Sequence, residues 1–213
     1  MEKRKRAFAS VLFFLAFIAW TLIVCFVDVK EIGPEQTRVG LATLNGGFHK
    51  TVGVNMFLYT LTDWLSIIPL GVAFCFAVVG FVQLCKRKSL LKVDKSILFL
   101  GVFYIATIIF YLFFEFVVIN YRPILIEGFL EASYPSSTTV LVLCVMSTSA
   151  IRLENRMKKG VLRTIILSFV AVFSIFMLVG RIISGVHWIS DIIGGILLSL
   201  SIISGYFATI EKA

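Results

Sequence analysis

Residues 7–27 have the sequence AFASVLFFLAFIAWTLIVCFV, a run of 21 residues without a charged side chain. A helix needs about 20 predominantly apolar residues to cross a bilayer. Further apolar stretches approach this length at residues 64–85, 96–119, 136–151, 164–180 and 188–209. The sequence therefore predicts an all-α fold, an integral membrane bundle of six transmembrane helices.

The composition supports a membrane protein. The 213 residues are 59% hydrophobic and only 15% charged, with a mean hydropathy of +1.00, whereas soluble proteins are about 45–50% apolar and about 25% charged. The net charge of +8 lies in clusters between the apolar stretches. That distribution is typical of membrane topology and argues against a nucleic-acid partner. With no internal repeat, residues 1–213 are expected to form a single domain whose partner is the lipid bilayer.

The basic residues also predict the orientation in the membrane. Most of the 20 Lys and Arg residues fall in three stretches, 3–6, 86–95 and 152–163. Threading six helices places these stretches on one side, and the positive-inside rule makes that side cytoplasmic, with both termini. The first apolar run is expected to be retained as an anchor, because it is longer than a signal-peptide core and lacks an A-x-A-like site. The plasma membrane is the expected location, and residues 28–63, 120–135 and 181–187 would face outward.

One outward stretch carries a chemically distinctive pattern, G-R-x5-H-x3-D, formed by Arg181, His187 and Asp191. Residues four apart share a face of a helix. An imidazole backed by a carboxylate is fixed in one tautomer, which leaves the other ring nitrogen free to act as a base or nucleophile. Ionisable groups at a membrane edge are candidate functional residues by default. A satisfied polar pair is the competing interpretation of His187 and Asp191.

Two other outward stretches suit a phosphate. Y-R-P at 121–123 supplies Arg122, and Y-P-S-S-T-T at 134–139 opens the fourth apolar segment. The planar donor fork of arginine matches phosphate oxygens. Pro135 is suited to the first turn of a helix, after which the backbone N–H groups would form an anion site. Lipid-headgroup contacts for the arginines and helix capping by the serines are the alternatives.

In this order the three stretches resemble the membrane-bound type-2 phosphatidic acid phosphatase superfamily, over roughly residues 60–209. The resemblance implies that His187 is the nucleophile, forming a phosphohistidine, and that Asp191 is its orienting partner. It also implies a set of phosphate-binding residues: Arg122, Arg181, Ser136, Ser137 and Thr138. The resemblance further implies that lipid phosphates or pyrophosphates are dephosphorylated at the outer membrane face without a metal. No metal or cofactor is therefore expected.

The chain departs from the superfamily pattern at two positions. Glu115 stands where a phosphate-binding lysine is usual, and Thr138 stands where a histidine would protonate the leaving group. General acid catalysis contributes about 10²–10⁴-fold, and a threonine hydroxyl cannot supply it. A phosphate leaving group needs no such proton, because its second pKa is about 6. A phosphoanhydride such as a polyprenyl pyrophosphate is therefore the expected preferred substrate, rather than a simple phosphatidate. His49 in the long outer segment could act as a substitute acid or be a solvated loop residue.

Three functions remain open at this level. The phosphohistidine could be resolved by water or by an acceptor group, so the chain could be a phosphatase or a phosphotransferase. The loss of the lysine and the histidine favours a catalytically weak or inactive lipid-phosphate-binding protein as the alternative. A transporter or channel is disfavoured because the helix centres are nearly uncharged. Asp63, just before Trp64, is expected to cap the start of the second helix.

Overall fold

The computed structural model describes residues 2–210, and within them six helical segments are long and apolar enough to cross a membrane. These segments are α1 (Glu2–Phe26), α3 with α4 (Met56–Leu65 and Ile67–Arg87), α5 (Lys95–Phe116), α6 (Ser137–Arg156), α7 (Val161–Ser184) and α8 (Ile189–Ile210). A short 3-10 turn, η2 (Leu90–Lys92), connects α4 to α5. The prediction of an all-α bundle of six transmembrane helices is confirmed.

The second span is broken into α3 and α4 and begins well before the predicted residue 64. Asn55 caps α3, where its side-chain oxygen accepts a hydrogen bond from the Leu58 amide at 3.0 Å. Pro69 in the first turn of α4 has no N–H to continue a helical ladder, which explains the break near Ser66. The prediction that Asp63 caps a helix start is wrong, because Asp63 lies inside α3.

The predicted outer loop of residues 28–63 is largely structured. Besides α3 it contains β1 (Lys30–Glu31), η1 (Pro34–Gln36), β2 (Arg38–Val39) and α2 (Ala42–Val52). The buried side chain of Asn45 in α2 donates to the Gly40 carbonyl at 2.7 Å and to the Ser190 hydroxyl at 2.9 Å. A Cβ atom at Gly40 would lie 1.6 Å from the Val24 carbonyl oxygen, so this contact requires glycine. Residues 28–63, called the outer segment below, are thereby attached to the beginning of α8.

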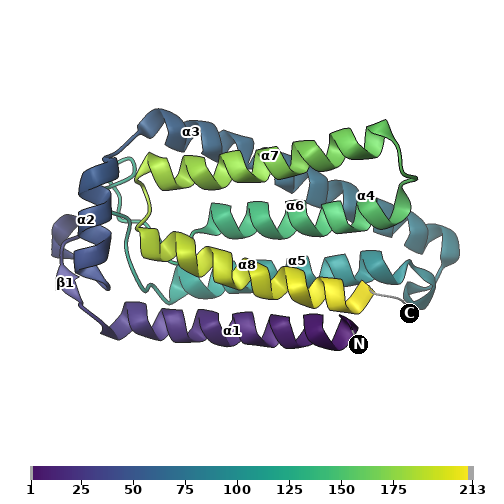
Figure 1. The fold of residues 1–213 in the computed structure, drawn as a ribbon, viewed down its shortest axis with the longest axis horizontal. Coiled ribbons are helices and arrows are strands. Elements are labelled where there is room, and N and C mark those ends of the chain that lie inside the picture. The colour runs from purple at the N-terminus through teal and green to yellow at the C-terminus, as the bar shows by residue number, and fades with distance from the viewer. Residues whose placement is uncertain (1, 211–213) are drawn as a thin grey trace.

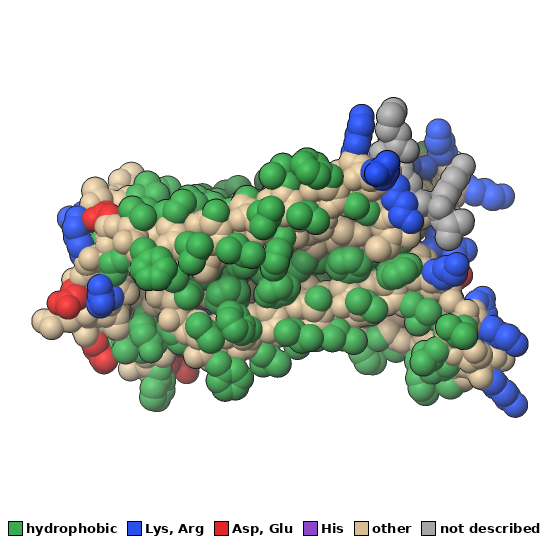
Figure 2. Space-filling model, turned by 90° about the horizontal axis from the view of Figure 1, so that it is seen from below, with side chains coloured by type: hydrophobic (Ala, Val, Ile, Leu, Met, Phe, Trp, Pro, Cys, Tyr) green, Lys and Arg blue, Asp and Glu red, His purple; other side chains and the backbone are tan. Residues whose placement is uncertain are grey.

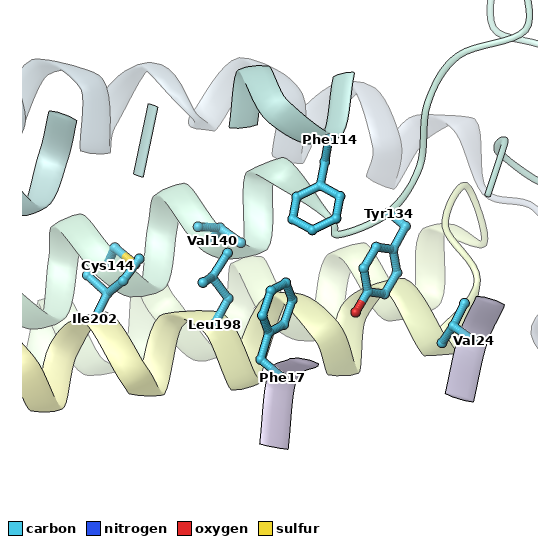
Figure 3. Packing of buried hydrophobic residues seen from close by; sticks show 8 residues of the cluster. All are labelled: Phe17, Val24, Phe114, Tyr134, Val140, Cys144, Leu198 and Ile202. Atoms are coloured by element: carbon cyan, nitrogen blue, oxygen red, sulfur yellow. The ribbon is translucent and has the colours of Figure 1, made fainter. Parts of the chain in front are cut away.

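Helix α1 lies along α8 (Figure 1), and aromatic side chains that include Phe17, Phe114 and Tyr134 form an aromatic core between the helices (Figure 3). The Tyr134 ring stacks on Phe17 with centroids 6.2 Å apart and meets Phe114 edge-on at 5.6 Å. Its hydroxyl lies 2.7 Å from that of Thr21. A Cβ atom at Gly194 would lie 2.6 Å from the tyrosine ring, so this glycine lets α8 approach it. These contacts fix the chain just before α6.

The surface matches a membrane protein. Hydrophobic side chains cover the length of the bundle, and Lys and Arg side chains gather at one end (Figure 2). Large apolar side chains such as Phe8, Phe74 and Phe81 are each more than 60% exposed. A soluble monomer rarely exposes such a continuous apolar surface. The chain is a multi-pass membrane protein. Three parts of it lie at the end opposite the basic one (Figure 1): the outer segment, the connection 117–136 and the connection 185–188.

Candidate active site

His187 lies in the connection 185–188 between α7 and α8. The prediction that it shares a helical face with Asp191 is wrong, because α8 begins two residues after the histidine. Gly185 makes the tight connection possible, since it has φ +65° and a Cβ there would lie 1.9 Å from the Gly53 carbonyl oxygen. The turn therefore packs directly against the outer segment and presents the imidazole beside the start of α8.

Asp191 is fully buried, and its carboxylate accepts four hydrogen bonds. The donors are the Asn120 amide at 3.0 Å, the Ser133 hydroxyl at 2.5 Å, the Trp188 backbone N–H at 3.1 Å and the Ser190 hydroxyl at 3.3 Å. The Trp188 bond caps the first turn of α8 from its third residue, as in a capping box. The network holds the carboxylate in one orientation.

Ser133 stands between the two predicted catalytic residues. Its hydroxyl oxygen lies 3.0 Å from Nδ1 of His187 and 2.5 Å from Oδ2 of Asp191. No direct hydrogen bond joins His187 and Asp191 in the described chain, so the predicted orientation of the imidazole by Asp191 runs through the serine. Sequence reasoning missed Ser133 because its partners are more than 50 residues away and a single serine in a loop carries no spacing signal.

Arg122 reaches the other side of the imidazole. Its Nη1 lies 3.3 Å from Nε2 of His187, and its Nε lies 2.9 Å from the Glu131 carboxylate. The Trp188 indole donates to the Tyr121 carbonyl at 2.7 Å and so ties the loop of Arg122 to the histidine turn. The two sequence motifs that carry Arg122 and His187 therefore meet at one point.

Arg181 is placed in the last turn of α7, not in the outer loop 181–187 that the sequence predicted. It is only 1% exposed. Its Nη2 donates to the Asp63 carboxylate at 3.0 Å and to the hydroxyl of Thr138. Within residues 2–210, its Nε and Nη1 have no hydrogen-bond partner. Buried polar groups are normally paired, so two open N–H groups on a buried guanidinium are well suited to an anion.

Tyr59 links the two arginines. The centroid of its ring lies 5.1 Å from the guanidinium carbon of Arg181 and 5.7 Å from that of Arg122. Both guanidinium groups therefore lie near the ring of one side chain. Tyr59 and Asp63 are four residues apart on α3. Sequence reasoning missed this pair at the site because residues 56–63 were assigned to a loop.

The predicted phosphate-binding residue Ser136 has other partners. It is the N-cap residue of α6, and Pro135 precedes it rather than lying in the first turn as predicted. Its backbone N–H donates to the Asp191 carbonyl at 3.0 Å, and its hydroxyl accepts a hydrogen bond from Thr139 at 3.0 Å. The backbone N–H of this buried serine thus joins the start of α6 to α8, and its hydroxyl bonds within the first turn of α6.

A cavity of about 380 Å³ adjoins the site and runs between the helices. Ser133, Ser137, Thr138 and Asp63 line its outer end, together with Glu115, which replaces the usual lysine. The remainder is mostly apolar and comes from α4, α5, α6 and α8, including Leu70, Ile108, Phe110, Phe114, Val140, Leu141 and Leu198. The arrangement places a group of polar side chains at one end of an otherwise apolar cavity.

Burial, together with the charges of Arg122 and Arg181, holds the pKa of His187 well below its usual value of 6.5. The neutral imidazole therefore persists as the pH falls through 6.5 and becomes protonated only at lower pH. We expect nitrogen NMR of protein with isotope-labelled histidine to show this titration. Replacing Arg122 by glutamine removes one cation and should raise the pKa of His187.

The chain has only two histidines, so His49 serves as the internal control for that titration. Burial alone lowers the pKa of His49, which should therefore not respond to Arg122→Gln. A His187 pKa at or above 6.5 in the wild-type protein would contradict this electrostatic description of the site.

His49 lies on α2 with its ring 5.5 Å from the Trp188 ring. It has no hydrogen bond to Arg122, Arg181 or His187 among the described residues. A lowered pKa keeps its imidazole neutral, which disfavours proton donation. The hypothesis that His49 replaces the missing acid stays a prediction.

The amino-acid sequence matches a known protein family. The family model described as the PAP2 superfamily matches residues 96–213, more than half of the chain. The chain belongs to the PAP2 superfamily. The predicted resemblance to the type-2 phosphatidic acid phosphatases is thereby confirmed, and the PAP2 match includes His187, Ser133 and both arginines, while Tyr59 and Asp63 lie outside it.

A solved PAP2 structure has a similar fold. It is the crystal structure of a transmembrane PAP2-type phosphatidylglycerolphosphate phosphatase from Bacillus subtilis, with a TM-score of 0.55 and 16% sequence identity. The alignment covers 94% of each chain. At this identity the likeness is one of fold. No match was found among curated proteins.

Proposed function

We propose that this PAP2 protein is a membrane lipid phosphatase in which His187 is the nucleophile. One observation carries the proposal: the buried imidazole has Nδ1 on the Ser133 hydroxyl and Nε2 beside Arg122. Such an imidazole presents an unprotonated nitrogen to a site with the open N–H groups of Arg181. Arg122, beside the imidazole, and Arg181 both lie near the Tyr59 ring, at 5.7 and 5.1 Å, so the neutral nucleophile and the proposed anion site are neighbours.

The chemistry follows from these positions. Nε2 of His187 attacks phosphorus, a nitrogen–phosphorus bond forms, and the bond from phosphorus to the leaving oxygen breaks. Arg122 and Arg181 stabilise the charge on the transferring oxygens. A water oxygen then attacks phosphorus, breaks the nitrogen–phosphorus bond and releases phosphate. An acceptor hydroxyl in place of water would make the same protein a phosphotransferase.

The first turn of α6 is the proposed auxiliary phosphate-binding element. The backbone N–H groups of Ser137 and Thr138 lie at a helix N-terminus, where an anion is favoured. The Thr138 hydroxyl already accepts a hydrogen bond from Arg181, so Thr138 positions the guanidinium as well. Ser136 contributes by holding this turn against Asp191.

The cavity supports a lipid substrate. Its apolar walls suit a hydrocarbon chain, and Ser133 and Thr138 at its outer end belong to the site. The Bacillus subtilis PAP2 structure is, by its title, a phosphatidylglycerolphosphate phosphatase. A phosphorylated lipid with its tail in the cavity and its phosphate between the two arginines fits both observations.

The charge distribution supports an extracytoplasmic site. The basic stretches 3–6, 86–95 and 152–163 belong to one end of the bundle, where Lys and Arg side chains gather (Figure 2). The connection between α7 and α8, which carries His187, lies at the other end (Figure 1). By the positive-inside rule the basic end and both termini are cytoplasmic. We therefore place the reaction at the outer face of the plasma membrane, with residues 1–213 acting as one domain.

The replacement of the usual histidine by Thr138 predicts a substrate preference. A polyprenyl pyrophosphate should release phosphate on the order of 10²–10⁴-fold faster than a phosphatidate, because only the alkoxide leaving group needs a proton donor. The measurement is phosphate release from both lipids in the same mixed micelles, with His187→Gln as the blank. Faster turnover of the phosphatidate would contradict the preference.

The second candidate is a catalytically weak or inactive lipid-phosphate-binding protein. It is favoured by Glu115 and Thr138, the two residues that depart from the superfamily pattern. The same assay separates the two functions. A binder would retain the labelled pyrophosphate lipid and release phosphate at the same rate as His187→Gln.

A further inference from the structure

Ser133 occupies a buried position between two titratable groups. It is 2% exposed, and its neighbours His187 and Asp191 are 5% and 0% exposed. The oxygen of the serine is within hydrogen-bond distance of both. In the part of the chain that is described, the serine is thus the sole hydrogen-bonded link between the carboxylate and the imidazole.

The direction of the two hydrogen bonds follows from donor capacity. An ionised carboxylate only accepts, and a serine hydroxyl has one hydrogen to donate. Because Ser133 donates to Asp191, its oxygen must accept the hydrogen bond from Nδ1–H of His187. The Arg122 guanidinium, which can only donate, lies 3.3 Å from Nε2. The serine and the arginine therefore both favour the tautomer in which Nδ1 carries the proton and Nε2 carries the electron pair.

The backbone holds this serine in place independently of its side chain. The Ser133 N–H donates to the Asn120 carbonyl at 2.9 Å, and the Asn120 side chain donates to Asp191 at 3.0 Å. The next residue, Tyr134, is buried in the aromatic core (Figure 3). Removing the Ser133 hydroxyl should therefore leave the loop in position and change only the bridge.

We propose that Ser133 is a positioning residue that couples Asp191 to His187 and, together with Arg122, sets the tautomer of the nucleophile. This inference rests on the proposed function and deepens it. When Nε2 bonds to phosphorus, the ring gains positive charge while Nδ1 keeps its proton. The Asp191 carboxylate polarises the Ser133 hydroxyl, whose oxygen accepts the hydrogen bond from Nδ1–H. The bridge therefore stabilises the positively charged, phosphorylated ring more than the neutral resting ring.

The direct test is nitrogen NMR of histidine-labelled protein in detergent. The spectrum contains signals from two imidazoles, and the His49→Ala variant shows which of them belong to His49. His187 should show the Nδ1–H tautomer in the wild-type protein and in Ser133→Thr, which retains a hydroxyl. Because Arg122 also donates to Nε2, this tautomer preference should be lost when Ser133→Ala is combined with Arg122→Met, while Arg122→Met alone should retain it. The matched control is Ser199→Ala, since Ser199 is a buried serine of α8 whose hydroxyl donates to the Gly195 carbonyl at 2.7 Å.

The kinetic test uses phosphate release from a polyprenyl pyrophosphate. Ser133→Ala should lower kcat about 10–100-fold, the usual effect of losing a hydrogen bond to a charged group, with little change in KM. Ser133→Thr should recover most of the rate, and Ser199→Ala should match the wild type. An Nδ1–H tautomer that persists in the variant combining Ser133→Ala with Arg122→Met, or an unchanged kcat in Ser133→Ala, would overturn the proposal. The tautomer requires no turnover, so a failure of the proposed phosphatase activity remains distinguishable.

Discussion

Replacing His187 by glutamine is expected to lower phosphate release by at least about 10⁴-fold, because removal of a catalytic nucleophile typically has effects of this size. Glutamine retains a polar side chain of similar size but cannot form the phosphorylated intermediate. The binding of the lipid phosphate should persist, since Arg122 and Arg181 remain. The measurement is the rate of phosphate release from a polyprenyl pyrophosphate by purified protein in mixed micelles.

The control for this variant is His49→Gln, because His49 lies at the same end of the molecule without a hydrogen bond to the proposed site in residues 2–210. Its rate should stay within a few-fold of the wild type, because the lowered pKa of His49 disfavours proton donation. A larger loss would instead support His49 as the substitute acid. If His187→Gln retains a tenth or more of the wild-type rate, the nucleophile has been assigned to the wrong residue.

Replacing Arg181 by methionine should lower kcat/KM by about 10²–10³-fold, the effect of removing one donor that stabilises the transition state. The buried guanidinium offers Nε and Nη1 to an anion while Nη2 bonds to Asp63 and Thr138. Lysine at this position would retain the charge but not the planar fork. Arg181→Lys should therefore recover only part of the loss in the same phosphate-release assay.

Arg38 provides the matched control for the arginine variants. It is an exposed arginine of β2 in the outer segment, so Arg38→Met removes the same charge from the same end of the molecule. Its kcat/KM should change little. Equal losses in Arg38→Met and Arg181→Met would indicate a general electrostatic effect instead of a phosphate contact at Arg181.

Much of this fold could be predicted from the sequence because bilayer crossing depends on the length of an apolar run. The stretch 96–119 has one charged residue, Glu115, near its outer end, and forms the single helix α5. Helix boundaries were harder to predict. Arg181 was expected outside the membrane segment, yet it extends α7, since Asp63 and Thr138 bond its buried guanidinium.

The site was predictable only where motifs with distinctive chemistry were involved. His187 and Arg122 lie side by side, as expected. They could be recognised because charged or titratable residues stand out in an apolar chain and both are next to the ends of predicted helices. Ser133 and Tyr59 were missed for a different reason. Their roles depend on contacts across long stretches of chain, and neither a serine nor a tyrosine has a spacing that indicates such contacts.

The most direct measurement is the trapping of the covalent intermediate. Protein turning over a polyprenyl pyrophosphate with a radiolabelled terminal phosphate is quenched in alkali, digested and mapped by mass spectrometry. We predict a phosphoryl group on His187 that is stable to base and labile to acid, and that is absent from His187→Gln. Full turnover with no label on His187, or with label on another residue, would contradict nucleophilic catalysis by this histidine.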